Sequence, residues 1–104
     1  MNINQAISEY INTIEINEGK SLNTIKSYSR DLNIYSKFLN NKKIDNIKKI
    51  DSSIVNDFLS SISSKYSTNS INRIKTSVKS FHQYINFKYE IKDPTVNIEV
   101  HKAV

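Results

Sequence analysis

The side chains that could carry out chemistry are few, and none has the neighbours that catalysis requires. The chain contains two histidines, six tyrosines, no cysteine and one glycine. The spacing of His82 and His101 does not suit joint coordination of a metal ion, and no cysteine thiolate is present as a further ligand. No serine has a base and an orienting acid around it, and one glycine cannot build a phosphate-binding loop. The sequence therefore predicts no catalytic residue, no metal site and no cofactor.

Three of the tyrosines and His82 have the helical spacing of residues that pack in a core. Tyr10, Tyr28 and Tyr35 fall on apolar stripes, and His82 lies at the edge of another. The other three tyrosines lack the cluster of Arg and His that would activate a nucleophile. We therefore expect structural roles for these side chains.

Charge is unevenly distributed along the chain. Residues 1–19 carry three Glu and no Lys or Arg, whereas residues 20–104 carry all 15 basic residues against 7 acidic ones, which gives −3 and +8 of the total +5. The first segment is unsuited to a polyanion, but the rest could bind one. Charge alone leaves two interpretations open, namely nucleic-acid binding and a lysine-rich surface that keeps a small protein in solution.

Apolar residues recur at spacings of three and four over four segments, which predicts four helices. They run from residue 3 to about 19, from 22 to about 40, from 51 to about 62, and from 68 to before 93, with Asn2, Ser21 and Asp51 as N-caps of the first three. One or two isoleucines of the connector 40–50 should be buried. Helices with short connections bury their stripes only against one another, so we expect a compact all-α, four-helix orthogonal bundle. We assign residues 1–93 to this domain and 94–104 to the start of an extended linker.

The outer faces of the second and fourth helices are rich in basic and amide side chains. Only Asp31 is expected to interrupt the face of the second helix, and Ile34 is expected there as an exposed apolar residue. Phosphate contacts use Lys, Arg, hydroxyls and helix N-termini, and Asn and Arg can also bond base edges. The predicted DNA-binding residues are Lys20, Asn23, Thr24, Lys26, Ser27, Arg30, Asn69, Asn72, Arg73, Lys75, Thr76 and Lys79.

Three segments together resemble the N-terminal, SAM-like core-binding domain of tyrosine recombinases of the phage-integrase and Xer type. SLNTIKSYSRDLNIYSKFL (21–39) is similar to the family's opening motif, 47–62 to its short third helix, and 67–99 to its last helix. The matching positions are Ser21, Thr24, Tyr28, Arg30, Asp31, Leu32, Arg73, Ser80, Phe81, Tyr84 and Pro94. Where family members usually place Arg in the last helix, this chain has Asn72 and Lys79.

The resemblance implies one half of a C-shaped clamp around duplex DNA, with the second and fourth helices toward the DNA. In the family, a larger C-terminal domain carries the catalytic Arg, Lys, His and tyrosine nucleophile, and four protomers assemble on two DNA sites. We therefore expect these 104 residues to be a non-catalytic, DNA-binding fragment of a longer site-specific recombinase. With no cysteine, no signal peptide and no apolar run long enough for a membrane span, we expect a cytoplasmic location.

Two other functions remain open at this stage. The acidic first helix could serve a protein-interaction domain, since family assemblies use such surfaces between protomers. The chain could also be an unrelated small helical DNA-binding protein with a helix-turn-helix core.

Overall fold

The computed structural model describes residues 1–17 and 19–98, which form four α-helices and one short 3₁₀ helix. The elements are α1 (Ile3–Ile16), α2 (Leu22–Asn41), η1 (Ile47–Lys49), α3 (Ser52–Ser63) and α4 (Thr68–Tyr89). Within the same residues there is no β-strand, only an isolated antiparallel bridge between Asn2 and Asn46. The predicted all-α class is confirmed.

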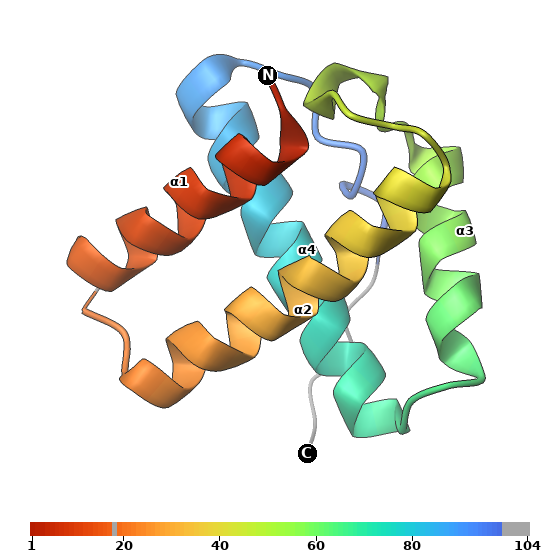
Figure 1. Cartoon of the computed structure of the whole chain (residues 1–104), viewed down its shortest axis with the longest axis horizontal. Coiled ribbons are helices and arrows are strands. Elements are labelled where there is room, and N and C mark those ends of the chain that lie inside the picture. Colours follow the sequence, from red (N-terminus) through yellow and green to blue (C-terminus); the bar gives the residue numbers. More distant parts are fainter. Residues whose placement is uncertain (18, 99–104) are drawn as a thin grey trace.

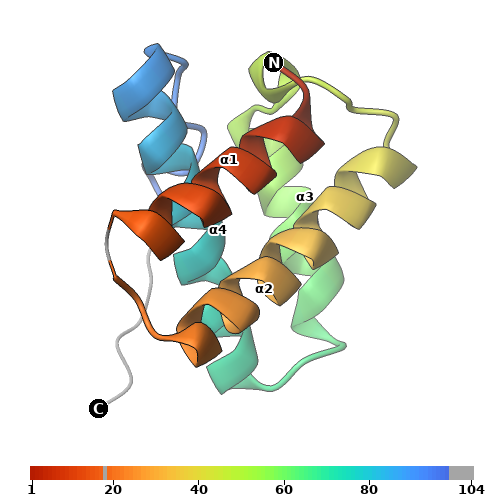
Figure 2. The same ribbon diagram turned by 60° about the vertical axis from the view of Figure 1, so that its left-hand side comes forward.

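The helices form two pairs that cross (Figure 1). α1 and α2 run in opposite directions, and so do α3 and α4, while α4 crosses α2 near the centre of the molecule. Both α2 and α4 begin at the lower end of the molecule in Figures 1 and 2. The radius of gyration, 13.0 Å, is that of a compact chain of this length. The arrangement is consistent with the predicted SAM-like bundle.

Local sequence explains where the helices begin. The side chains of Asn2, Ser21 and Asp51 accept hydrogen bonds from free amides of the first turns of α1, α2 and α3, which confirms the three predicted caps. Ser67 caps α4 in the same way. Between α1 and α2 the chain turns at Gly19, whose φ of +58° is in the left-handed region that glycine adopts without strain.

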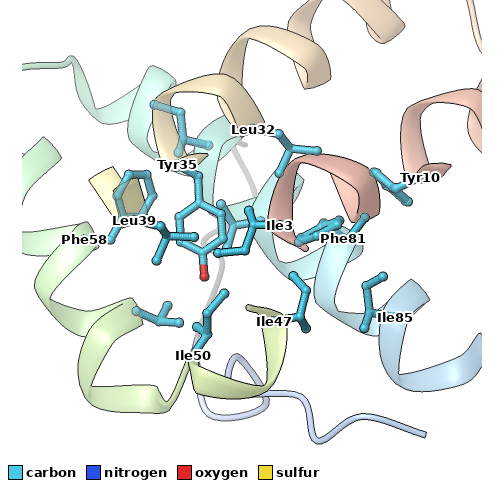
Figure 3. Packing of buried hydrophobic residues seen from close by; sticks show 14 of the residues in the cluster. Ile3, Tyr10, Leu32, Tyr35, Leu39, Ile47, Ile50, Phe58, Phe81 and Ile85 are labelled. Carbon is cyan, nitrogen blue, oxygen red and sulfur yellow. The ribbon is translucent and has the colours of Figure 1, made fainter. Parts of the chain in front are cut away.

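One hydrophobic core joins all the helices (Figure 3). Tyr35, Phe58 and Phe81 are fully buried in it, together with Leu32 and Leu39 of α2. Ile44, Ile47 and Ile50 are also buried, so the connector contributes three isoleucines rather than the expected one or two. Among the residues that the structure describes, no helix is both long enough and apolar enough to cross a membrane.

Three predicted orientations on α2 are wrong. The apolar spacing of the second helix predicts that Leu22 is buried with the core stripe, but it is 64% exposed as the first residue of α2. Ile34 was expected to be exposed, yet it packs partly buried against the core. Asp31 was expected beside the outer face and is fully buried instead.

The segment after α4 also differs from its prediction. Pro94 and Thr95 are buried, residues 94–97 form turns, and Ile98 packs against the core. Residues 94–98 are therefore folded back onto the domain rather than extended. The remainder of the predicted linker, 99–104, lies outside the described residues.

Candidate nucleic-acid interface

Asp31 joins α2 to α4 through a bidentate ion pair with Arg73. The guanidinium donates from Nη2 to Oδ1 at 3.0 Å and from Nε to Oδ2 at 3.1 Å, while the Ser77 hydroxyl donates to Oδ2 at 2.8 Å. The Asp31 side chain is fully buried and the Arg73 side chain is 41% exposed. Hydrogen bonding to Asp31 raises the pKa of Arg73, so the guanidinium stays charged. Since two helices meet at this pair, it fixes their mutual orientation.

The ion pair also determines which predicted residues lie together. At about 100° per residue, Asn23, Ser27 and Arg30 lie within about 100° of Asp31 round α2, on the side away from the core. Asn69, Arg73 and Thr76 lie within about 100° of Ser77 round α4, again away from the core. Because both helices bury the same core on the other side of this contact, these residues face one common solvent surface. With Lys26 and Asn72 farther out, they form what we term the α2–α4 surface: Asn23, Lys26, Ser27, Arg30, Asn69, Asn72, Arg73 and Thr76.

Side chains of the α2–α4 surface are accessible to different degrees. Asn23, Lys26, Arg30 and Asn69 are exposed, while Ser27, Asn72 and Thr76 are half-buried. The Thr76 hydroxyl donates to the Asn72 carbonyl oxygen at 2.9 Å, within its own helix. At the start of α2, the hydroxyls of Thr24 and Ser21 lie 2.9 Å apart, so Thr24 takes part in the helix cap. Lys20, before the helix, is half-buried.

Lys75 and Lys79 lie farther round α4 from its contact with α2. Both fall about 160° from Ser77 round the helix. The Lys79 ammonium donates to the carbonyl oxygen of Thr95 at 2.9 Å and, more distantly, to that of Val96 at 3.5 Å. Ten of the predicted residues thus lie on the α2–α4 surface or at the start of α2, while Lys79, only about 20° from Asn72 round α4 but two turns farther on, binds the segment after the helix.

Sequence reasoning missed the buried acceptor that organises this surface. Asp31 precedes the stripe residue Leu32, and Ser77 precedes Val78, so both lie at the edges of stripes. A sequence signal for this contact does exist. It is a small polar residue at the stripe edge of each of two helices, with an Arg one turn before the serine. Periodicity alone could not reveal that the edges meet.

His82, Tyr35, Tyr84 and Tyr89 are engaged in packing or in hydrogen bonds, while His101 lies outside the described residues. The Tyr35 hydroxyl lies 2.8 Å from Nε2 of His82, and both side chains are buried. Burial lowers the pKa of His82 to about 4 and raises the pKa of Tyr35. Tyr84 and Tyr89 donate to the Glu9 carboxylate at 2.9 and 2.7 Å. Within residues 1–17 and 19–98, no three His, Cys, Asp or Glu side chains are grouped so that they could hold a metal ion.

Comparison of the sequence with known proteins identifies the family of this chain. The family model described as "Phage integrase, N-terminal SAM-like domain" matches residues 7–86. The chain is 42% identical over 102 residues to "Tyrosine recombinase XerD" of Staphylococcus epidermidis, an alignment that covers 96% of this chain and 35% of that protein. It is 42% identical over 98 residues to the protein of the same name from Staphylococcus haemolyticus, covering 92% of this chain and 33% of that one.

A third relative, "Tyrosine recombinase XerD" of Staphylococcus aureus, is 39% identical over 95 residues, which cover 89% of this chain and 32% of the relative. The chain thus spans about a third of the length of the curated relatives it matches. No solved structure matches it. Since the family model covers most of the chain and the helices follow the expected order, the chain belongs to the phage-integrase N-terminal SAM-like domain family, the N-terminal domain family of tyrosine recombinases.

Proposed function

We propose that this chain is the non-catalytic DNA-binding domain of a site-specific tyrosine recombinase, holding duplex DNA at the recombination core site. The observation that carries the proposal is the charge of the α2–α4 surface. Asp31 is the one acidic residue of α2, and α4 has none. Since Asp31 is fully buried and paired, the solvent side of this surface presents basic, amide and hydroxyl groups.

The residues of this surface divide by the kind of contact that their chemistry allows. Lys26 and Arg30 carry exposed charges and suit phosphate oxygens. The amides of Asn69 and Asn72 can donate to and accept from base edges, whereas Thr76, whose hydroxyl donates to the Asn72 carbonyl oxygen, can accept. Phosphate contacts position a protein on DNA, whereas base contacts discriminate between sequences. In the parent recombinase, cleavage and rejoining of DNA would fall to a separate catalytic domain, with four protomers assembled on two DNA sites.

Salt dependence of duplex binding tests the proposal. Fluorescence anisotropy with a labelled duplex should show affinity that falls linearly with salt on a log–log scale, and each lost phosphate contact lowers the slope by about 0.9. We expect that change for Lys26→Ala and for Arg30→Ala. Lys48→Ala is the matched control, because Lys48 is an exposed lysine on η1, at the end of the molecule opposite the starts of α2 and α4. Asn72→Ala should change preference among duplexes with little change in slope.

Two results would overturn the proposal. One is the absence of salt-sensitive binding, and the other is an equal response to Lys26→Ala and Lys48→Ala. Either would favour a protein-interaction domain instead. The non-catalytic part is tested separately, since the purified chain should form no covalent adduct with end-labelled duplex on a denaturing gel.

A further inference from the structure

We infer that Asp31 is a positioning residue for DNA binding: from inside the α2–α4 contact it holds the guanidinium of Arg73 so that its outer N–H groups meet a backbone phosphate. This inference rests on the proposed function and makes it more specific. An acidic side chain, Asp31, should therefore strengthen the binding of DNA, although DNA is itself negatively charged.

The first step is the asymmetry of the ion pair. Asp31 is fully buried, whereas 41% of the Arg73 side chain is exposed. The negative group thus lies inside the protein and the positive group at its surface. A phosphate on the α2–α4 surface would be closer to the guanidinium than to the carboxylate, so the pair attracts it although its net charge is zero.

The second step is the number of donors that remain. A guanidinium has five N–H groups in a fixed plane. Asp31 engages Nε and Nη2, and among the residues that the structure describes no side chain or carbonyl accepts from Nη1 of Arg73. The outer edge of the guanidinium therefore keeps N–H donors for a planar, bidentate contact with phosphate oxygens.

The third step is rigidity. Oδ2 of Asp31 also accepts from Ser77, whose hydroxyl lies 3.1 Å from the Arg73 carbonyl oxygen one turn earlier in α4. An arginine with its inner edge fixed loses less rotamer freedom on binding than a free one. The neighbouring Arg30 and Lys26 are exposed and appear in no ion pair among the described residues, so Arg73 is the pre-oriented cation of this surface.

The decisive test is the DNA affinity of Asp31→Asn, which should change in opposite directions for the two possible roles of Asp31. If the carboxylate acts only through its charge, Asp31→Asn should tighten DNA binding, because a negative charge near the phosphates is removed. If it positions Arg73, Asp31→Asn should weaken binding roughly tenfold, the size of one charge-assisted hydrogen bond. Asp57→Asn is the matched control, since it removes the same charge from an exposed position on α3 and should leave binding unchanged or slightly tighter.

Arg73→Lys provides a second variant that keeps the charge and does not depend on how well Asp31→Asn folds. A lysine ammonium bound to Asp31 has no planar outer edge, so we expect the salt slope to fall by about 0.9 while the melting temperature changes little. The Nε–H resonance of Arg73 in the wild-type chain should also shift when duplex is added, which a purely structural ion pair would not do.

Folded Asp31→Asn that binds duplex as tightly as Asp57→Asn would overturn the inference. So would Arg73→Lys with wild-type affinity and slope. In both cases Lys26→Ala and Arg30→Ala would still report whether the chain binds DNA at all, so failure of this inference can be distinguished from failure of the proposed function.

Discussion

The two halves of α4 meet their partner helices through carboxylates that differ in burial. In the first half, Arg73 and Ser77 donate to a carboxylate that is fully buried in α2, and the cation remains at the surface. In the second half, Tyr84 and Tyr89 donate to Glu9 of α1, whose side chain is 32% exposed, and Lys88 pairs with it at 3.4 Å. In the first cluster only the cation reaches solvent, whereas in the second both the Glu9 carboxylate and the Lys88 ammonium do so.

This difference separates a surface suited to binding from a contact that serves packing. The phenols of Tyr84 and Tyr89 donate their hydroxyl hydrogens to Glu9, so they leave no O–H donor for a ligand. The Asp31 cluster uses only part of its donor group. A hydrogen-bonded carboxylate can therefore stabilise the fold in both places, yet only at Asp31 is the carboxylate fully buried while its cation stays exposed, since at Glu9 both charges of the ion pair reach solvent.

Phe81 lies between the two halves, and its truncation should have the largest effect. It is fully buried, with its ring 5.8 Å from Tyr10 of α1 and 5.1 Å from His82. Phe81→Ala should lower the free energy of unfolding by about 3–5 kcal/mol, measured by urea denaturation, because large-to-small core changes leave cavities. Against a total of roughly 5–15 kcal/mol, both clusters would come apart together.

Phe87→Ala on the same helix is the control for that prediction. The Phe87 side chain is 88% exposed, so its loss should change stability by less than about 0.5 kcal/mol. Equal stability losses for the two variants would contradict the assigned packing of α4.

The helices could be predicted because their signals are local. Apolar residues three and four apart gave the stripes, and Asn2, Ser21 and Asp51 supplied caps within three residues of the amides they bind. Leu22 shows the limit of this reasoning. It has the spacing of a stripe residue, but burial also requires a neighbour, and periodicity does not say where neighbouring helices end.

The candidate interface could be predicted only in part, for a related reason. Periodicity assigned each side chain to a side of its helix, and Lys26 and Arg30 are exposed as their positions predict. It could not show that Asp31 and Arg73, 42 residues apart, would meet. Nor could it show that Lys79 would meet Thr95, because that contact depends on a chain reversal after α4. Contacts between distant residues follow from tertiary packing rather than from local pattern.

Acid should weaken the centre of the molecule before it affects the Glu9 cluster. Burial holds the pKa of His82 near 4, below its ordinary 6.5, while the charge of Asp93 opposes that shift. The unfolded chain therefore binds a proton that the folded chain excludes, and stability falls as pH drops from about 6.5 toward 4. The loss should reach on the order of 3 kcal/mol in urea denaturation at successive pH values.

His82→Gln keeps a polar partner for Tyr35 but cannot take up a proton in this range. Its stability should therefore depend less on pH between 6.5 and 4.5 than that of the wild-type chain. Parallel pH dependences for the two proteins would rule out His82 as the cause.

Glu9→Gln should have a smaller effect that appears at lower pH. The hydrogen bond from Tyr89 lowers the pKa of Glu9 from its ordinary 4.5. The Tyr84 hydroxyl and the Lys88 ammonium lower it further. The stabilisation by this carboxylate is thus present above pH 4.5 and is lost as pH falls through the folded-state pKa. We expect a loss of about 1 kcal/mol at neutral pH, since the group is partly exposed. An unchanged melting temperature, together with an unchanged acid transition, would show that the cluster contributes nothing to stability.

The smallest effect on global stability is expected at Lys79 of α4, which binds the segment after the helix. Its ammonium donates to the Thr95 carbonyl oxygen, which also accepts from the backbone amide of Ile98 at 3.1 Å. Lys79→Met keeps the aliphatic stem but removes the charge. Amide hydrogen exchange at Ile98 should then accelerate by roughly tenfold through local opening, while core amides of α4 stay protected.

Two further variants serve as controls. Lys26 is an exposed lysine with no such contact, so Lys26→Met should leave exchange at Ile98 unchanged. Lys79→Arg should restore protection. If exchange at Ile98 is the same in all three variants, the 93–98 segment is held by the burial of Pro94 and Thr95 alone. The Lys79 contact would then add nothing to the attachment of this segment, and its ammonium would stabilise neither half of α4.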